Sequence, residues 1–306
     1  MKKIIIALLF TATVFNLQAQ AGKISQENLE ILGEYEDTLG LVSYMVIHDS
    51  LPENRFAATK KLITTLVQAL KTENSFNYKF GQVRSVSIQY PADSTFRIFT
   101  WQLYVDVDDY RYFGAIQMNQ PELKLYPLFD RSANVQSPEN VVLRPEKWYG
   151  ALYYNIREFD TAAGRKYLLF GFNGLNLFTK RKVVDVLTIE NGEARFGAPV
   201  FIKEDPQTGQ QLALNRIVKE YSAESSFRMN YDETFGLIMF DHLVTSGGNY
   251  GQGPVQVTDG SYEGYKYENG RWYWVEKVFN QTQDEAPRPE PVFNKGKVDI
   301  FGKKKH

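Results

Sequence analysis

The first long pattern of apolar and polar positions in the chain is helical. Between residues 25 and 72, apolar side chains recur at the spacing of a helix face. Ser25 is a residue type that caps helix starts, and Pro52 suits the first turn of a second helix. The polar tripeptide HDS at residues 48–50 separates the two apolar runs. The pattern predicts an N-terminal helical hairpin.

From about Val83 the pattern becomes that of extended strands. Runs rich in Tyr, Phe and Val follow one another between short turns. The runs form groups that begin near Val83, Trp148 and Leu212, which suggests three copies of one antiparallel meander. The Asn269-Gly270 pair predicts a tight hairpin. Several runs are apolar on both faces, which is typical of sheets covered on both sides.

These patterns predict a mainly β fold with an N-terminal helical element. Consecutive antiparallel four-stranded meanders are expected to stack like propeller blades, and a β-sandwich or barrel is the alternative. The predicted organisation is a signal peptide over residues 1–21, a helical element over 22–75, a β body over 76–280 and a tail over 281–306. The tail is rich in Pro and Lys and is expected to be disordered. Its candidate anchors on a partner are Phe293 and Phe301.

The N-terminus has the features of an export signal. Lys2 and Lys3 precede a short apolar run, and small residues follow at Ala19 and Ala21. This order predicts a secretory signal peptide that is cleaved after Ala19 or Ala21, and the run is too short to anchor the chain in a bilayer. No later segment is long and apolar enough to span a membrane as a helix. We therefore expect an exported protein, in the periplasm or on the periplasmic face of the outer membrane.

Composition narrows the possible chemistry. The chain has no cysteine, which excludes disulfides, thiolate metal sites and cysteine nucleophiles. Its 35 basic and 36 acidic residues give no general attraction to nucleic acid. The chain has 19 Tyr, 21 Phe and 4 Trp, a content that suits half-buried strands and also sugar-stacking surfaces. The aromatic candidates for binding are Trp148, Tyr149, Trp272 and Trp274.

The run GLIMFDHL places Asp241 beside His242 in an apolar strand. Neighbouring strand residues point to opposite faces, so the pair is expected to be structural unless the strand bulges. The three histidines show no metal-binding spacing, and no G-x-S-x-G or phosphate-binding loop is present. No cofactor is expected.

Carboxylates give weaker signals. The turn DVDDY is a weak candidate for a hard cation such as calcium, although turns favour aspartate without any metal; its carboxylates are Asp106, Asp108 and Asp109. The paired carboxylates of a glycosidase meet in space rather than in sequence. Candidates for such a pair are Glu220, Glu224 and Asp232. The glycine-rich stretch SGGNYGQG, residues 246–253, is predicted to be a mobile loop, and a role in rimming a binding surface is the alternative.

Several strings resemble a family of exported, uncharacterised proteins of Bacteroidota-type bacteria. They are FRIFTW, YRYFGAIQ, YLLFGFNG, MNYD with IMFDHL, and DGSYEGYKYENGRW, and the similarity runs from about Ser25 to Phe279. No activity is known for that family, so the resemblance implies only a location in the envelope of a two-membrane cell. The tail has no β-sandwich sorting domain, which favours the periplasm.

Because no catalytic motif stands out, the sequence favours a non-catalytic binding or scaffold protein. Its predicted role is as a subunit of a cell-envelope protein complex, with a protein partner. The alternative is a carbohydrate-active enzyme or glycan-binding protein that uses carboxylates and aromatic residues in a cleft. Whether the protein is an enzyme stays open, with the non-catalytic interpretation preferred.

Overall fold

The two predicted helices open the fold. The computed structural model describes residues 22–205, 207–249, 251 and 253–279. Helices α1 (Gln26–His48) and α2 (Pro52–Leu70) form the predicted hairpin. The Ser25 hydroxyl accepts a hydrogen bond from the Asn28 amide at 3.1 Å, and Pro52 begins α2, so both start signals are confirmed. The predicted signal peptide and tail lie outside the described residues.

The strands form three sheets, and all but one of the pairings between strands are antiparallel. The first sheet has the order β1 (Ser87–Gln89), β2 (Phe96–Asp106), β3 (Asp109–Met118) and β4 (Leu125–Phe129). The second contains β5 (Leu152–Thr161), β6 (Gly164–Asn173), β7 (Thr179–Glu190), β8 (Glu193–Phe196) and β11 (Ile217–Ser222). The third contains β9 (Phe201–Glu204), β10 (Gln211–Leu214), β12 (Met229–Asp232), β13 (Leu237–Gly247), β14 (Pro254–Glu268) and β15 (Arg271–Val275).

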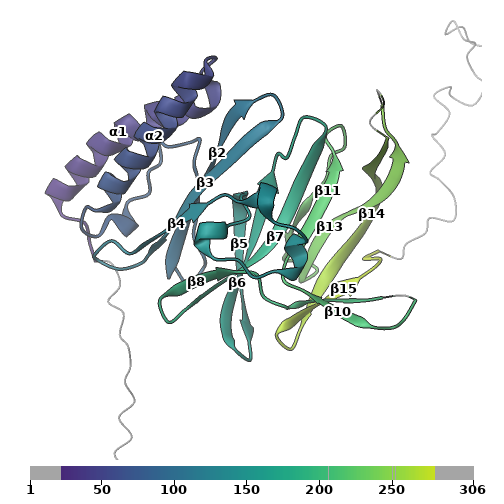
Figure 1. The fold of residues 1–306 in the computed structure, drawn as a ribbon. Coiled ribbons are helices and arrows are strands. Elements are labelled where there is room, and N and C mark those ends of the chain that lie inside the picture. The colour runs from purple at the N-terminus through teal and green to yellow at the C-terminus, as the bar shows by residue number, and fades with distance from the viewer. Residues whose placement is uncertain (1–21, 206, 250, 252, 280–306) are drawn as a thin grey trace, which may run out of the picture.

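The helices and the three sheets stack as four successive layers (Figure 1). One apolar core lies between the helices and the first sheet, a second between the first and second sheets, and a third between the second and third sheets. The mainly β fold with two N-terminal helices and antiparallel sheets is as predicted. The described strands form three open sheets and close into no barrel or propeller.

Two-sided burial explains the strands that are apolar on both faces. In β6, Leu169 packs into the core beside the first sheet, whereas Leu168 and Phe170 pack into the core beside the third sheet. Successive side chains of a strand point to opposite faces, so each needs its own apolar layer. The second sheet is therefore covered on both sides, as the sequence indicates.

The third group of strands is not one continuous meander, which corrects the prediction that it begins near Leu212. Strand β9 leaves the second group and joins the third sheet, where it pairs in parallel with β15. Strand β11 leaves the third group and pairs with β7 in the second sheet. The two sheets thus exchange strands, and the chain crosses between them three times between Phe196 and Met229.

A buried ion pair fixes this exchange. Arg216 stands immediately before β11, and its Nε donates to Asp185 Oδ1 of β7 at 3.2 Å, with both side chains fully buried. The same guanidinium donates to the carbonyl oxygens of Pro138, Val141 and Phe196. Burial raises the pKa of Asp185, and the Arg216 charge opposes that rise. Three segments, around residues 138–141, Asp185 and Phe196, therefore converge on the Arg216 side chain.

Hairpin turns follow the sequence closely. Asn269 and Gly270 both have positive φ, at 49° and 83°, and join β14 to β15 by a two-residue turn. This is the backbone that an Asn-Gly pair favours, because both central residues must adopt left-handed conformations. The predicted hairpin is confirmed. No helix within the described residues is both long and apolar enough to cross a membrane.

Gly264 of β14 provides a test of the packing between β13 and β14. An added Cβ there would overlap the carbonyl oxygen of Ile238, whereas a Cβ at Gly247 of β13 would meet nothing within 4 Å. Gly264→Ala should lower the free energy of unfolding by about 1–3 kcal/mol through steric strain. Gly247→Ala, the control, should change it by less than about 0.5 kcal/mol. Urea denaturation measures both values, and equal stability of the two variants would contradict the pairing.

Candidate functional site

Asp241 and His242 make separate contacts. Strand β13 is irregular between Asp241 and Leu243, which is the bulge that the sequence left open. Asp241 is buried, and its carboxylate accepts a hydrogen bond from the backbone amide of Arg228. His242 is partly exposed and lies with Nδ1 2.9 Å from Oδ2 of Asp259 on β14. The two neighbours therefore do not act on one another.

The His242–Asp259 contact belongs to a small surface network. Asp259 Oδ1 accepts hydrogen bonds from the Ser261 amide at 2.9 Å and from its hydroxyl at 2.7 Å. These bonds lower the pKa of Asp259 to about 2, and the contact with His242 makes a smaller contribution in the same direction. A nucleophilic triad requires the serine hydroxyl on the histidine. Here Ser261 donates to the aspartate instead. The network therefore has a structural role: it holds His242, which lies at the bulge of β13, against β14.

The aspartates of the β2–β3 turn serve the backbone. Asp106 Oδ1 accepts from the Val107 amide at 2.7 Å, and Asp108 Oδ1 accepts from the Leu177 amide at 2.5 Å. Asp108 has a positive φ of 64°, a conformation that aspartate tolerates in turns. Asp109 pairs with Asp106 across the hairpin. Within the described part of the chain, no group of three His, Asp or Glu side chains is placed to hold a metal ion.

The aromatic candidates lie mostly in the cores. Trp148 and Tyr149 are 0% and 2% exposed, and Trp148 Nε1 donates to the Tyr153 hydroxyl at 2.8 Å. Trp272 is also buried, between the second and third sheets. These three side chains present no ring surface to a sugar. Trp274 is partly exposed, with Lys203 over its ring at 4.5 Å. Phe293 and Phe301 lie outside the described residues.

The carboxylates considered for hydrolysis each have hydrogen-bond partners of their own. Glu220 accepts from Arg181 at 2.6 Å, and Glu224 accepts from the side-chain amide of Asn249 at 3.1 Å. Asp232 caps the turn after β12 by accepting backbone amides. Glu220 also lines a pocket.

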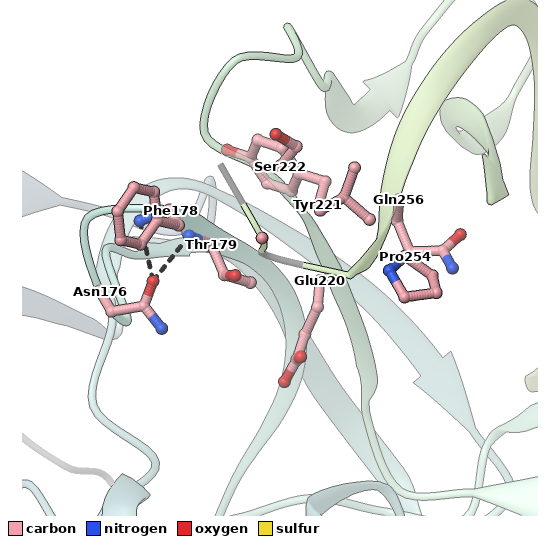
Figure 2. A pocket seen from close by; sticks show the side chains of 10 residues that line it. Asn176, Phe178, Thr179, Glu220, Tyr221, Ser222, Pro254 and Gln256 are labelled. Carbon is pink, nitrogen blue, oxygen red and sulfur yellow. Dashed lines mark hydrogen bonds between the residues drawn. The ribbon is translucent and has the colours of Figure 1, made fainter. Parts of the chain in front are cut away.

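That pocket lies between the second and third sheets and has a volume of about 540 Å³. Figure 2 shows Asn176, Phe178 and Thr179 on one side and Pro254 and Gln256 on the other. The remaining wall residues are Glu220, Tyr221, Ser222, Gly251 and Val255. Gly251 comes from the glycine-rich stretch 246–253, and Pro254 follows its end. The strand exchange forms this pocket, because it places β11 of the second sheet, with Glu220 to Ser222, opposite β14 of the third sheet.

The pocket presents polar atoms that the described residues leave unpaired. Asn176 Oδ1 accepts the amides of Phe178 and Thr179 at 2.9 and 2.7 Å, which holds this loop in place. The Asn176 side-chain nitrogen and the Thr179 hydroxyl have no partner among the described residues. Gln256 donates to Thr245 at 2.9 Å through its nitrogen. The pocket thus combines free donors and acceptors with one half-exposed phenyl ring, that of Phe178.

Hydrogen bonds connect the turns around this pocket. Asp108 binds the Leu177 amide, the Phe178 carbonyl accepts from Ala223 at 2.7 Å, and Glu224 accepts from Asn249. We call this set the loop edge: residues 106–109, 174–178, 223–225 and 248–249. Figure 1 shows these turns along one edge of the stacked sheets. The sequence analysis singles out the DVDDY turn, Glu224 and the glycine-rich stretch separately, but it does not predict that these turns lie together.

No protein-family model, curated protein or solved structure matches this chain. The site therefore rests on its own geometry.

The Asp259 network predicts a pH dependence. Its pKa of about 2 in the folded protein lies below the ordinary 3.8, so its charge stabilises the fold above about pH 4. That contribution should be lost as the pH falls from about 4 to 2. NMR titration should give Asp259 a pKa near 2, and Ser261→Ala should raise it, whereas the control Ser246→Ala should not. Titration of the wild-type carboxyl near 3.8 would refute the network.

Proposed function

We propose that this chain is an exported, non-catalytic binding or scaffold protein, a subunit of a cell-envelope complex in the periplasm or at the periplasmic face of the outer membrane. The signal-peptide pattern of residues 1–21 and the family resemblance support the location. In this proposal the three sheets stack in the manner of propeller blades and act as a rigid support. The loop edge then holds the protein partner.

Exposed apolar side chains on the loop edge are the observation that carries the proposal. Val107, Leu177 and Phe178 are 65%, 53% and 49% exposed. They come from two turns that the Asp108–Leu177 hydrogen bond joins. Large apolar side chains grouped at a surface mark interaction sites, because burial against a partner removes them from water. Pre-ordered turns also reduce the entropy lost on binding.

A charged substitution on the loop edge tests this role. Leu177→Asp should weaken a stoichiometric complex isolated from native envelopes by about tenfold or more, since an unpaired charge would be buried. The control is Leu41→Asp, which changes a leucine on α1 that is 65% exposed. The complex is measured by co-purification and size-exclusion chromatography. Equal loss in both variants, or loss in neither, would refute the loop edge as the interface.

The tail requires a separate experiment. Residues 281–306 lie outside the described part of the chain, and their role as a docking arm rests on the sequence alone. In this proposal Phe293 and Phe301 anchor the arm on the partner. Deletion of residues 281–306 should then weaken the same complex, and an unchanged complex would limit the interface to the folded body.

A second candidate function is glycan binding in the pocket of Figure 2. The free amide and hydroxyl groups of Asn176 and Thr179 suit sugar hydroxyls, and Phe178 supplies a ring for stacking. The wall has a single carboxylate, Glu220, whereas glycoside hydrolysis generally needs two. The pocket therefore supports binding of a neutral saccharide rather than its cleavage.

Phe178→Ala tests the glycan candidate. Removal of the ring should weaken binding of cellobiose or chitobiose about fivefold to tenfold, as measured by calorimetry. Leu177→Ala is the matched control, because Leu177 is equally exposed and lies outside the pocket wall. No binding of either disaccharide to the wild-type protein would remove this candidate.

A further inference from the structure

A second cavity lies at the opposite end of the layers, beside the helices. The helices pack on β2 and leave an opening between α2 and strands β3 and β4. Its volume is about 240 Å³. The wall is formed by Ile63, Leu66, Val67 and Leu70 of α2, by Trp101 of β2, and by Phe113, Gly114, Ala115, Leu125, Pro127, Leu128 and Phe129 of β3 and β4.

This cavity is apolar and open to solvent. Its wall contains no charged side chain, and the Trp101 indole stacks on the Phe113 ring at 5.7 Å. Phe129 is 52% exposed, so one side is accessible from outside. Cavities lined in this way favour apolar ligands over water. At about 30 Å³ per water-sized group, there is room for about eight methylene groups.

A polar pocket adjoins the apolar cavity. Its volume is about 640 Å³, and it shares Phe113, Leu128 and Phe129 with the cavity. Its wall includes the exposed side chains of Arg111 and Arg131. Neither guanidinium has a hydrogen-bond or ion-pair partner among the residues that the structure describes. The shared aromatic wall therefore places an apolar compartment directly beside two available cations.

The polar pocket also contains two carboxylates, Asp109 and Asp130, so its formal charges balance. Asp130 is occupied by backbone and hydroxyl donors, because it accepts from the Tyr112 amide at 3.0 Å and from the Ser132 amide and hydroxyl at 2.9 and 2.7 Å. Asp109 also lines the pocket, at its solvent-exposed end. Among the described residues neither carboxylate forms an ion pair with Arg111 or Arg131, so both guanidinium groups keep their hydrogen-bond donors for an anionic head group.

We propose that these two compartments form one binding site for an amphiphile with an acyl chain and an anionic head group. The chain enters the apolar cavity beside α2, and the head group binds Arg111 and Arg131. A guanidinium pairs with a carboxylate or phosphate through two parallel hydrogen bonds, so either head group fits. The acyl chain can belong to a free fatty acid or to a lipid in a membrane. This inference goes beyond the proposed function, because the apolar cavity and the two arginines lie outside the loop edge; Asp109 is common to the loop edge and the polar pocket.

Decanoate is the first probe, and decanol is its neutral counterpart. Calorimetry should show that decanoate binds the wild-type protein about tenfold more tightly than decanol, since only decanoate offers a charge to the arginines. Trp101 emission should change on binding because its ring lines the cavity. Arg111→Gln combined with Arg131→Gln should remove the preference for decanoate. The control, Arg84→Gln, changes an exposed arginine outside both pockets and should leave it intact.

A second variant tests the apolar compartment. Val67→Asp places a charge in the cavity wall and should abolish binding of both probes, whereas Leu41→Asp on α1 should not. Circular dichroism of each variant separates loss of binding from loss of folding. Vesicles of anionic phospholipid distinguish a membrane source from a free fatty acid, and binding to either supports the site. Equal affinity for decanol and decanoate, or no binding of decanoate and vesicles, would overturn it.

Discussion

The buried Arg216–Asp185 pair is the constraint on which the arrangement of the second and third sheets depends. Burying two charges is costly unless their hydrogen-bonding capacity is satisfied. The guanidinium meets this condition with the carboxylate and with three backbone carbonyls, including that of Phe196 at the end of β8, whereas Asp185 Oδ2 is buried without a partner among the described residues. The pair holds the start of β11 against β7, so β11 completes the second sheet although the preceding strand, β10, belongs to the third. Loss of either partner would leave an uncompensated buried charge. It would also release the start of β11 from β7.

The exchange has a direct consequence for function. Strand β11 brings Glu220, Tyr221 and Ser222 to the boundary between two sheets, where β14 supplies the opposite wall of the pocket. Cross-sheet bonds keep this boundary closed elsewhere, as between the Tyr154 hydroxyl and the Met229 carbonyl, and between Lys219 and Glu263. Near the loop edge the two sheets leave the pocket of Figure 2 between them. A binding surface there is formed by rigid elements with turns tied to one another, which is the arrangement that limits the entropy cost of recognition.

Local signals predicted local structure well. Ser25 and Pro52 marked the two helix starts, and Asn269-Gly270 marked a hairpin, because each acts through backbone geometry within a few residues. The exchange of β9 and β11 was not predictable in this way, since it depends on contacts between segments that are distant in the chain. The same holds for the site. Composition suggested aromatic binding residues, but burial decides their role, and it places Trp148 in a core and leaves Phe178 at the pocket.

Incomplete layers explain where the apolar cavity arises. The second sheet has a neighbour on each face, so its apolar residues are fully used in packing. The first sheet has a complete neighbour on one face only, because the helices cover β2 and extend less far over β4. Leu125, Pro127 and Phe129 of β4 consequently line an opening between the first sheet and α2. A ligand bound there would replace the missing part of the helical layer, and it would stabilise the folded state by mass action. That stabilisation would act on the helices and the first sheet, whereas the pocket of Figure 2 lies between the second and third sheets.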